Sequence, residues 1–222
     1  MKPEVSKSIL NSLTAVLLTF ALGVLAFSFG KVVWKTKCKR SEKVQTLPTY
    51  AQVPEFILTE RNTKTVSLSD LKGKVWIANF MFTHCAGICP LMSNKMKSLQ
   101  ETLSDSFGIR FVSFSVDPER DTPEVLSRYA ERYQADPIKW FFLTGDKKTI
   151  YNLSAQHFHL GVEEIPQEKK EDLDQSVQHS SKFVLVDIKG KIRGYYDSEN
   201  PTALEQLVKD AESLLGEASK FQ

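Results

Sequence analysis

The sequence has few cysteines, few histidines and no excess of one charge, and each shortage excludes a class of protein. Only three cysteines occur among 222 residues, which excludes a small fold held together by many disulfides. Lys and Arg total 29 against 27 Asp and Glu, a net charge of +2, so the composition indicates no nucleic-acid partner. With 41% hydrophobic residues, the chain also lacks the composition of a disordered protein.

One long uncharged stretch is present, between residues 9 and 29. It is dominated by Leu, Ala, Val and Phe, and as a helix it is long enough to cross a hydrocarbon core of about 30 Å. We therefore predict an N-terminal segment, residues 1–30, that carries a transmembrane anchor at about 9–29. A cleaved signal peptide is the alternative, but the apolar core of such a peptide usually spans about 7–15 residues. Either interpretation directs the chain to a membrane.

A polar and basic stretch, residues 31–53, follows the anchor and is predicted to be a linker. The remaining residues, 54–222, fit one domain. More basic residues follow the anchor than precede it. The positive-inside tendency would therefore favour a cytoplasmic domain, whereas the resemblance given below implies the opposite side of the membrane.

Within residues 54–222, apolar strand patterns alternate with amphipathic helix patterns. We expect strands at 75–82, 110–116, 140–143, 182–187 and 192–196, and helices from 91, at 123–133, at 147–157 and from 201. A Lys-Gly-Lys turn at 189–191 is a hairpin signal. Thr122 with Pro123, and Asn200 with Pro201, are typical helix starts. The pattern predicts an α/β fold with a mixed central sheet flanked by helices.

Cys85 and Cys89 form the most informative pattern, because these two thiols lie where the strand at 75–82 leads into a helix. The amino terminus of a helix carries partial positive charge, which favours thiolate over thiol and lowers the pKa of a cysteine placed there. A spacing of four lets the two thiols approach each other or share one ion, and it meets the geometric requirement of a disulfide. The spacing alone leaves metal binding and redox chemistry open.

A metal site would need further ligands, and the chain offers four histidines, His84, His157, His159 and His179. His179 precedes the strand at 182–187, where a loop could reach the sheet end that carries the cysteines. Two thiolates and one imidazole suit Cu(I), or Cu(II) with a further donor. We expect His84 to tune the site or pack rather than bind, and the other two histidines, at a helix end, to be structural.

Taken together, these motifs resemble the Sco/SenC family. The residues that carry the resemblance are Phe82-Thr83-His84-Cys85-x-x-x-Cys89-Pro90, the run from Val116 to Pro123, Thr144-Gly145-Asp146, and His179 ahead of Leu185-Val186-Asp187 and Gly190. The likeness extends from about Val53 to the C-terminal helix. The chain departs from the family pattern at Ala86-Gly87, where many members have Pro-Asp, and at Gln178, where many have an acidic residue.

The resemblance implies a thioredoxin-like fold tethered by one transmembrane helix. It also implies copper delivery to the binuclear copper site in subunit II of cytochrome c oxidase, with other copper chaperones as further partners. Cys85, Cys89 and His179 match the ligands of copper, as Cu(I) or Cu(II), and Asp174 matches an acidic neighbour of that histidine. The implied location is the periplasmic side of a bacterial inner membrane. A mitochondrial membrane is disfavoured because the N-terminus lacks an Arg-rich amphipathic stretch.

A thiol-disulfide oxidoreductase, which would form and break a disulfide between Cys85 and Cys89 while reducing partner cysteines, is the alternative. Against a general oxidoreductase, these cysteines are one residue further apart than in C-x-x-C, and no proline immediately precedes the strand at Lys182. A peroxidase fits less well, because residues 82–85 do not clearly reproduce the T-x-x-C context of a peroxidatic cysteine. Copper binding requires His179, whereas the oxidoreductase does not.

Overall fold

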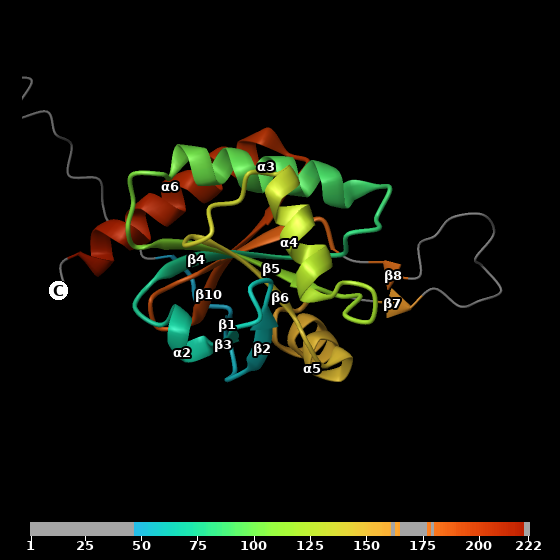
Figure 1. Cartoon of the computed structure of the whole chain (residues 1–222). Helices are drawn as coiled ribbons and strands as arrows, with labels where there is room; N and C mark the ends of the chain where they lie inside the picture. Colours follow the sequence, from blue (N-terminus) through green and yellow to red (C-terminus); the bar gives the residue numbers. More distant parts are fainter. Residues whose placement is uncertain (1–46, 161–162, 165–176, 179, 220–222) are drawn as a thin grey trace, which may run out of the picture. The chain divides into compact units, whose positions relative to one another are not determined.

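The computed structural model describes residues 47–160, 163–164, 177–178 and 180–219, which build a central sheet with helices on both faces (Figure 1). The predicted anchor at 9–29 lies outside the described residues, as do Asp174 and His179. Within these ranges, no helix is both long and apolar enough to cross a membrane.

The main sheet of the described chain has eight strands in the order β1-β10-β9-β4-β5-β6-β2-β3. Their bounds are Ala51–Gln52 (β1), Ile57–Glu60 (β2), Thr65–Ser67 (β3), Val75–Met81 (β4), Ile109–Ser115 (β5), Trp140–Thr144 (β6), Lys182–Val186 (β9) and Lys191–Asp197 (β10). β4, β5 and β6 are parallel, and the other neighbouring pairs are antiparallel. A separate ladder pairs β7, Glu163–Glu164, with β8, Val177–Gln178. The predicted mixed sheet is confirmed.

Helices connect and cover these strands. Their bounds are Leu68–Leu71 (α2), Ile88–Thr102 (α3), Pro123–Arg132 (α4), Lys147–Asn152 (α5), with a π-helical turn at Leu153–His157 directly after it, and Pro201–Ala218 (α6). α3 joins β4 to β5 and α4 joins β5 to β6, so the right-handed rule for parallel connections places both on one face. α6 lies beside α3, whereas α2 and α5 cover the opposite face (Figure 1).

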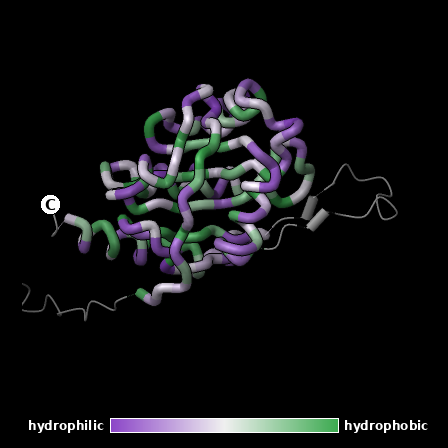
Figure 2. Tube along the Cα trace, turned by 90° about the horizontal axis from the view of Figure 1, so that it is seen from below, coloured by the Kyte–Doolittle hydropathy of each residue, from purple (hydrophilic) through white to green (hydrophobic). Residues whose placement is uncertain are grey.

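The core follows the central strands, where hydrophobic residues run through the middle of the domain (Figure 2). All seven residues of β4 are buried, as expected for a strand covered on both faces. A buried polar chain crosses the three parallel strands: the Trp140 indole donates to the Ser113 hydroxyl at 3.0 Å, which donates to the Asn79 side-chain oxygen at 2.7 Å. Because these groups are buried, their hydrogen bonds favour this strand register over others.

Several predicted boundaries shift in the structure. α3 begins at Ile88 rather than Leu91, so Cys89 lies in its first turn and Cys85 in the turn before it. The predicted helix at 147–157 is divided, because α5 passes into the π-helical turn. Asn200 caps α6 as predicted, accepting from the backbone N–H groups of Thr202 and Ala203.

The N-terminal side of the domain contains elements that the sequence patterns did not predict. β2 and β3 form a hairpin at one sheet edge, and α2 follows it. Residues 51–52, within the predicted linker, form β1 and pair with β10. The short lengths of these elements give little periodicity from which to predict them.

Candidate dithiol site

Cys85 lies in the connection between β4 and α3, and Cys89 lies in the first turn of α3, at the carboxyl end of the parallel strands. The Val116 N–H donates to the Met81 carbonyl at 2.9 Å, which brings the end of β5 beside this connection. The Cys85 N–H donates to the Phe82 carbonyl at 3.4 Å and closes a turn. Ligand sites in open α/β sheets form beyond the carboxyl ends of parallel strands, so the position is typical of a functional site.

The two cysteine side chains are in contact. Cys85 is 8% exposed and Cys89 is fully buried, and the structure holds both as thiols that hydrogen-bond to each other. This hydrogen bond and the burial raise the pKa of the Cys89 thiol, and the nearby charge of Asp121 adds to the effect, while a backbone hydrogen bond from Phe82 opposes it. The predicted lowering of the pKa at a helix start is therefore wrong for Cys89, because burial and its neighbours outweigh the helix terminus.

A buried carboxylate, Asp121, holds the dithiol turn in place through hydrogen bonds with Thr83 and Ser115. It is 0% exposed, and it accepts from the Thr83 N–H at 3.1 Å, the Thr83 hydroxyl at 2.5 Å and the Ser115 hydroxyl at 2.5 Å. Burial raises the pKa of Asp121, and the hydrogen bonds from Ser115 and Thr83 partly offset that rise. The carboxylate thus ties the turn after β4 to the end of β5.

The loop that carries Asp121 is itself held by hydrogen bonds. The Asp121 N–H donates to the Asp117 carbonyl at 2.9 Å. The Asp117 carboxylate accepts from Arg120 at 2.5 Å. Thr122 then caps α4 by accepting from the Val125 N–H, as predicted. The sequence patterns gave this loop only the roles of strand end and helix cap. The sequence does hold a signal for Asp121. Several acidic residues follow β5, the strand that pairs with β4, and β4 leads to the cysteines.

His84 lies next to this network with a half-exposed side chain. Its Nδ1 is 3.1 Å from the Thr83 hydroxyl oxygen and 4.0 Å from an Asp121 carboxylate oxygen. Because the Thr83 hydroxyl donates to Asp121, the Nδ1 of His84 acts as the donor to Thr83. Among the residues that the structure describes, no group of three or more His, Cys, Asp or Glu side chains could hold a metal. His84 therefore does not complete a three-ligand site with the cysteines.

The predicted third ligand, His179, and its acidic neighbour Asp174 cannot be compared with the cysteines, because both lie outside the described residues. The strand that follows His179 is placed. In the antiparallel register of β9 with β4, Val184 pairs with Ala78, so the amino end of β9 adjoins the carboxyl end of β4. The chain therefore enters β9 at the same edge of the sheet as the dithiol turn.

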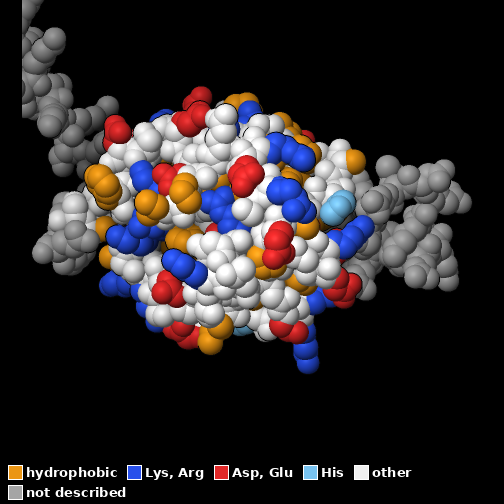
Figure 3. Space-filling view, in the orientation of Figure 1, with side chains coloured by type: hydrophobic (Ala, Val, Ile, Leu, Met, Phe, Trp, Pro, Cys, Tyr) orange, Lys and Arg blue, Asp and Glu red, His pale blue; other side chains and the backbone are white. Residues whose placement is uncertain are grey.

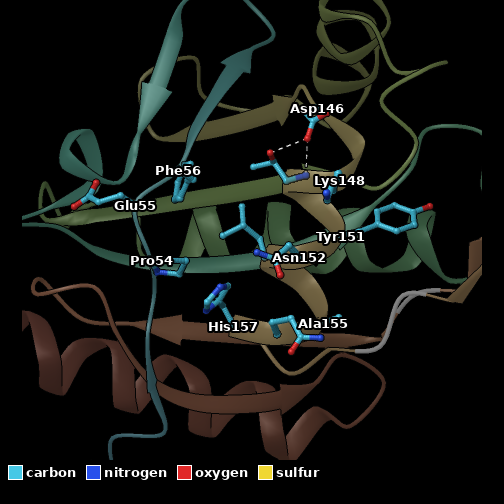
Figure 4. Close-up of a pocket in the computed structure, with 12 residues that line it drawn as sticks. Pro54, Glu55, Phe56, Asp146, Lys148, Tyr151, Asn152, Ala155 and His157 are labelled. Carbon is cyan, nitrogen blue, oxygen red and sulfur yellow. Dashed lines mark hydrogen bonds between the residues drawn. The ribbon is translucent and has the colours of Figure 1, made fainter.

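His157 and His159 lie in another part of the molecule. His157 lines a groove between residues 54–56 and α5 (Figure 4). The Asp146 carboxylate in this groove caps α5 by accepting from the N–H and hydroxyl of Thr149, at 2.7 and 2.8 Å. His159 has a positive φ of 50°. The groove is lined by no cysteine, so it offers none of the soft ligands of the dithiol turn.

The surface next to the thiols is small and apolar. Ala86 and Gly87, between the two cysteines, are both exposed, and Leu91 is 41% exposed one turn along α3. A second molecule could therefore approach Cys85 over an uncharged rim. These two residues between the cysteines are also where the sequence departs from the Sco/SenC pattern.

A mixed sheet whose central strand leads through a dithiol turn into a helix defines a thioredoxin-like protein. Residues 44–216 match the model of one family with this fold, SCO1/SenC. The chain belongs to the SCO1/SenC family.

Three similar proteins illustrate this relation. The SCO1 protein homolog of Bacillus subtilis is 36% identical over 168 residues, which cover 75% of this chain and 84% of the relative. BsSco, whose structure is described as showing a disulfide switch in a member of the Sco family of cytochrome c oxidase assembly proteins, is 34% identical, with a TM-score of 0.66 and coverage of 78% and 98%. ScoI of Bradyrhizobium japonicum, solved with copper bound, is 26% identical, with a TM-score of 0.62 and coverage of 74% and 99%.

Proposed function

We propose that this chain is a membrane-anchored copper metallochaperone that matures the binuclear copper site of cytochrome c oxidase subunit II. The observation that carries the proposal is the pair of hydrogen-bonded thiols of Cys85 and Cys89 at the carboxyl edge of the sheet. Family membership supports it, because one similar protein was solved with copper bound and another belongs to the cytochrome c oxidase assembly proteins.

Copper is the cargo in this proposal, held by Cys85, Cys89 and His179. Two thiolates and one imidazole form a soft ligand set that favours Cu(I), and Cu(II) would take a further donor. Asp174 would hydrogen-bond the histidine and fix its orientation. Because the pKa of Cys89 is raised, copper must displace a thiol proton when it binds.

Transfer of the cargo would proceed by ligand exchange. Cys85 is the more exposed of the two cysteines, and Ala86, Gly87 and Leu91 provide the uncharged surface around it. In delivery, a thiolate of subunit II would bind the copper beside Cys85 and displace the Cys85 thiolate, while Cys89 stays bound until the last step. Loading from another copper chaperone would run in reverse, with the Cys85 thiolate displacing a thiolate of that chaperone. The proposed location is the periplasmic side of a bacterial inner membrane, with the N-terminal helix as anchor.

A Cu(I) competition titration of the full chain in detergent tests the ligand set. His179→Ala should weaken copper binding by more than about tenfold, since loss of a ligand exceeds the usual effect of losing a supporting residue. Cys85→Ala/Cys89→Ala should abolish binding. His157→Ala, a histidine in the groove of Figure 4, is the matched control and should bind as the wild type does. If His179→Ala also binds as tightly as the wild type, the three-ligand site is wrong.

A thiol-disulfide reductase is the second candidate, favoured by the disulfide switch described for BsSco. The Cys85 thiolate would attack a partner disulfide and release one partner thiolate. Cys89 would then attack the mixed disulfide, freeing the second partner thiol and leaving a Cys85–Cys89 disulfide, so two electrons pass to the partner. A disulfide-exchange assay alongside the copper titration separates the candidates. For a reductase, His179→Ala should keep the rate of disulfide exchange. For a copper chaperone, the same variant should lose copper binding.

A further inference from the structure

The end of the sheet opposite the dithiol has a different surface, which we call the basal edge. It consists of the segments that precede the parallel strands β4, β5 and β6, residues 72–74, 103–108 and 133–139, together with Arg110 at the start of β5 and the β9–β10 turn at 187–191. Parallel strands share one amino edge, and β10 begins at this edge because β9 and β10 reverse direction in turn. In Figure 1 this edge lies at the left, where α3 ends.

Two large apolar side chains project from the basal edge. Phe107 is 88% exposed and Ile138 is 70% exposed, and they precede the neighbouring strands β5 and β6. Lys139 places its ammonium 5.8 Å from the centre of the Phe107 ring, and Arg110 donates to the Phe107 carbonyl at 3.1 Å. Phe107 is therefore an exposed apolar side chain with two cations close to its residue. Figure 3 shows apolar and basic side chains interspersed at the end of the domain where α3 ends.

The charge of the basal edge is mainly positive. Its basic residues are Lys72, Lys74, Arg110, Lys139, Lys189 and Lys191. Two of its carboxylates are engaged within the protein: Asp136 accepts from the N–H groups of Ile138 and Lys139, and Asp187 accepts from Arg193 at 2.8 Å. Asp105 remains exposed, the half-buried Glu217 of α6 lines one pocket with Lys189 and Lys191, and Lys72 is 2.6 Å from Glu55. The cations of this edge therefore outnumber the carboxylates that remain available to an approaching surface.

The polypeptide enters the domain at the same edge. Arg193, near the start of β10, donates to the carbonyls of Leu47 and Pro48, and the Tyr50 N–H donates to the Ile192 carbonyl. The sequence before this point contains the uncharged stretch at 9–29, then Lys31, Lys35, Lys37, Lys39, Arg40 and Lys43 against Glu42. Residues 30–46 can reach at most about 60 Å even when fully extended. If the proposed anchor spans the membrane, the basal edge is tethered within reach of the lipid surface.

We propose that the basal edge binds the anionic surface of the membrane, with Phe107 and Ile138 at headgroup level and Arg110 and Lys139 against lipid phosphates. Apolar side chains flanked by cations are the combination that binds an anionic interface. The seven residues of β4 span about 23 Å, so docking would hold the dithiol edge about that far from the bilayer and turned away from it. The inference uses the anchor of the proposed function but is independent of copper.

Hydrogen exchange of the full chain in lipid nanodiscs tests the proposal. Peptides covering 103–108 and 136–139 are compared between discs of phosphatidylcholine alone and discs containing phosphatidylglycerol. A docked fraction of about 70% would slow exchange of these peptides about threefold, and only in the anionic discs. The protection should disappear in Phe107→Ser/Ile138→Ser. Ile57→Ser is the matched control, because Ile57 is 72% exposed but lies in β2 towards the dithiol edge, and this variant should keep the protection.

Several results would overturn the proposal. Equal exchange in both kinds of disc would exclude binding to anionic lipid. Equal protection in detergent without phospholipid would assign the surface to a protein contact instead. Protection that survives in Phe107→Ser/Ile138→Ser would exclude these side chains as the anchor points. A chain that does not enter the discs would refute the transmembrane anchor and this proposal with it, whereas copper binding in detergent would be unaffected.

Discussion

The two ends of the parallel strands differ in the side chains that they bury and expose. At the dithiol edge, the carboxylate of Asp121 is buried and saturated by donors from Thr83 and Ser115. At the basal edge, Phe107 and Ile138 are exposed among cations. Burying a carboxylate and exposing large apolar side chains both cost folding free energy. The comparison separates two proposals: at one end a buried carboxylate holds the proposed copper-binding turn, and at the other exposed apolar side chains form the proposed membrane contact.

The two ends also differ in how they respond to pH. At the dithiol edge, a hydrogen bond that the Cys89 thiol donates to Cys85, together with burial, raises the pKa of Cys89, so this thiol is protonated near neutral pH. The folded state therefore favours the protonated form, and that stabilisation is complete below the pKa of an unfolded cysteine and is lost as pH rises through the folded pKa. The basal edge relies on Lys and Arg, whose ordinary pKa values lie well above neutral, so its charge is expected to stay constant between about pH 6 and 8.

The largest predicted effect follows from this difference. Copper affinity should rise by about tenfold per pH unit for each thiol proton that copper displaces, between about pH 6 and 8. The preference of the basal edge for anionic over zwitterionic discs should not change over the same range. The measurements are Cu(I) competition at each pH, against a chelator of known protonation, and hydrogen exchange corrected for its intrinsic pH dependence. A copper affinity that is flat with pH would mean that both thiols are already ionised.

The next largest effect is the loss of folding stability when Asp121 is replaced. Asp121→Ala removes the acceptor from the Thr83 N–H, the Thr83 hydroxyl and the Ser115 hydroxyl. We expect the free energy of unfolding to fall by about 2–3 kcal/mol, because buried donors are left without partners. The same substitution should lower the pKa of the Cys89 thiol, since the charge of Asp121 raises it. Denaturant unfolding of the full chain in detergent and a thiol titration measure the two effects.

An exposed carboxylate at the basal edge provides the control for Asp121→Ala. Asp105 is exposed in the basal segment 103–108, and Asp105→Ala should change stability by less than about 0.5 kcal/mol. Asp121→Asn keeps one acceptor oxygen and should recover part of the loss. If Asp121→Ala were as stable as Asp105→Ala, the carboxylate would not hold the dithiol turn in place.

The sequence predicted the dithiol edge much better than the basal edge. Long apolar runs identify central strands such as β4 and β5, because each is buried along its length. The two cysteines and the helix cap at Thr122 are local patterns that can be read without the fold. The acidic residues after β5 mark Asp121 as a candidate, but its supporting role cannot be assigned from the sequence, because its partners Thr83 and Ser115 come close only when β4 and β5 pair in parallel.

The basal edge was not predicted for a related reason. A single Phe or Ile in a loop shows no periodicity, and nothing in the local sequence says whether it will be buried. The segments that carry Phe107 and Ile138 come to the same edge only through the pairing of β5 with β6. The raised pKa of Cys89 also depends on packing, since the position in the first turn of α3 alone would have lowered it.

The smallest predicted effect concerns the residues between the cysteines. Ala86 is exposed, so Ala86→Asp should leave the fold unchanged and add a negative charge beside the thiols. The added charge disfavours a thiolate, and alkylation of the dithiol should slow by about two- to threefold at low salt, an effect screened at 1 M salt, where the Debye length is about 3 Å. Ala86→Asn has nearly the same size without the charge and should react as the wild type does. A slowing shared by both variants, or one that persists at high salt, would show that shape rather than charge at this position controls access to Cys85.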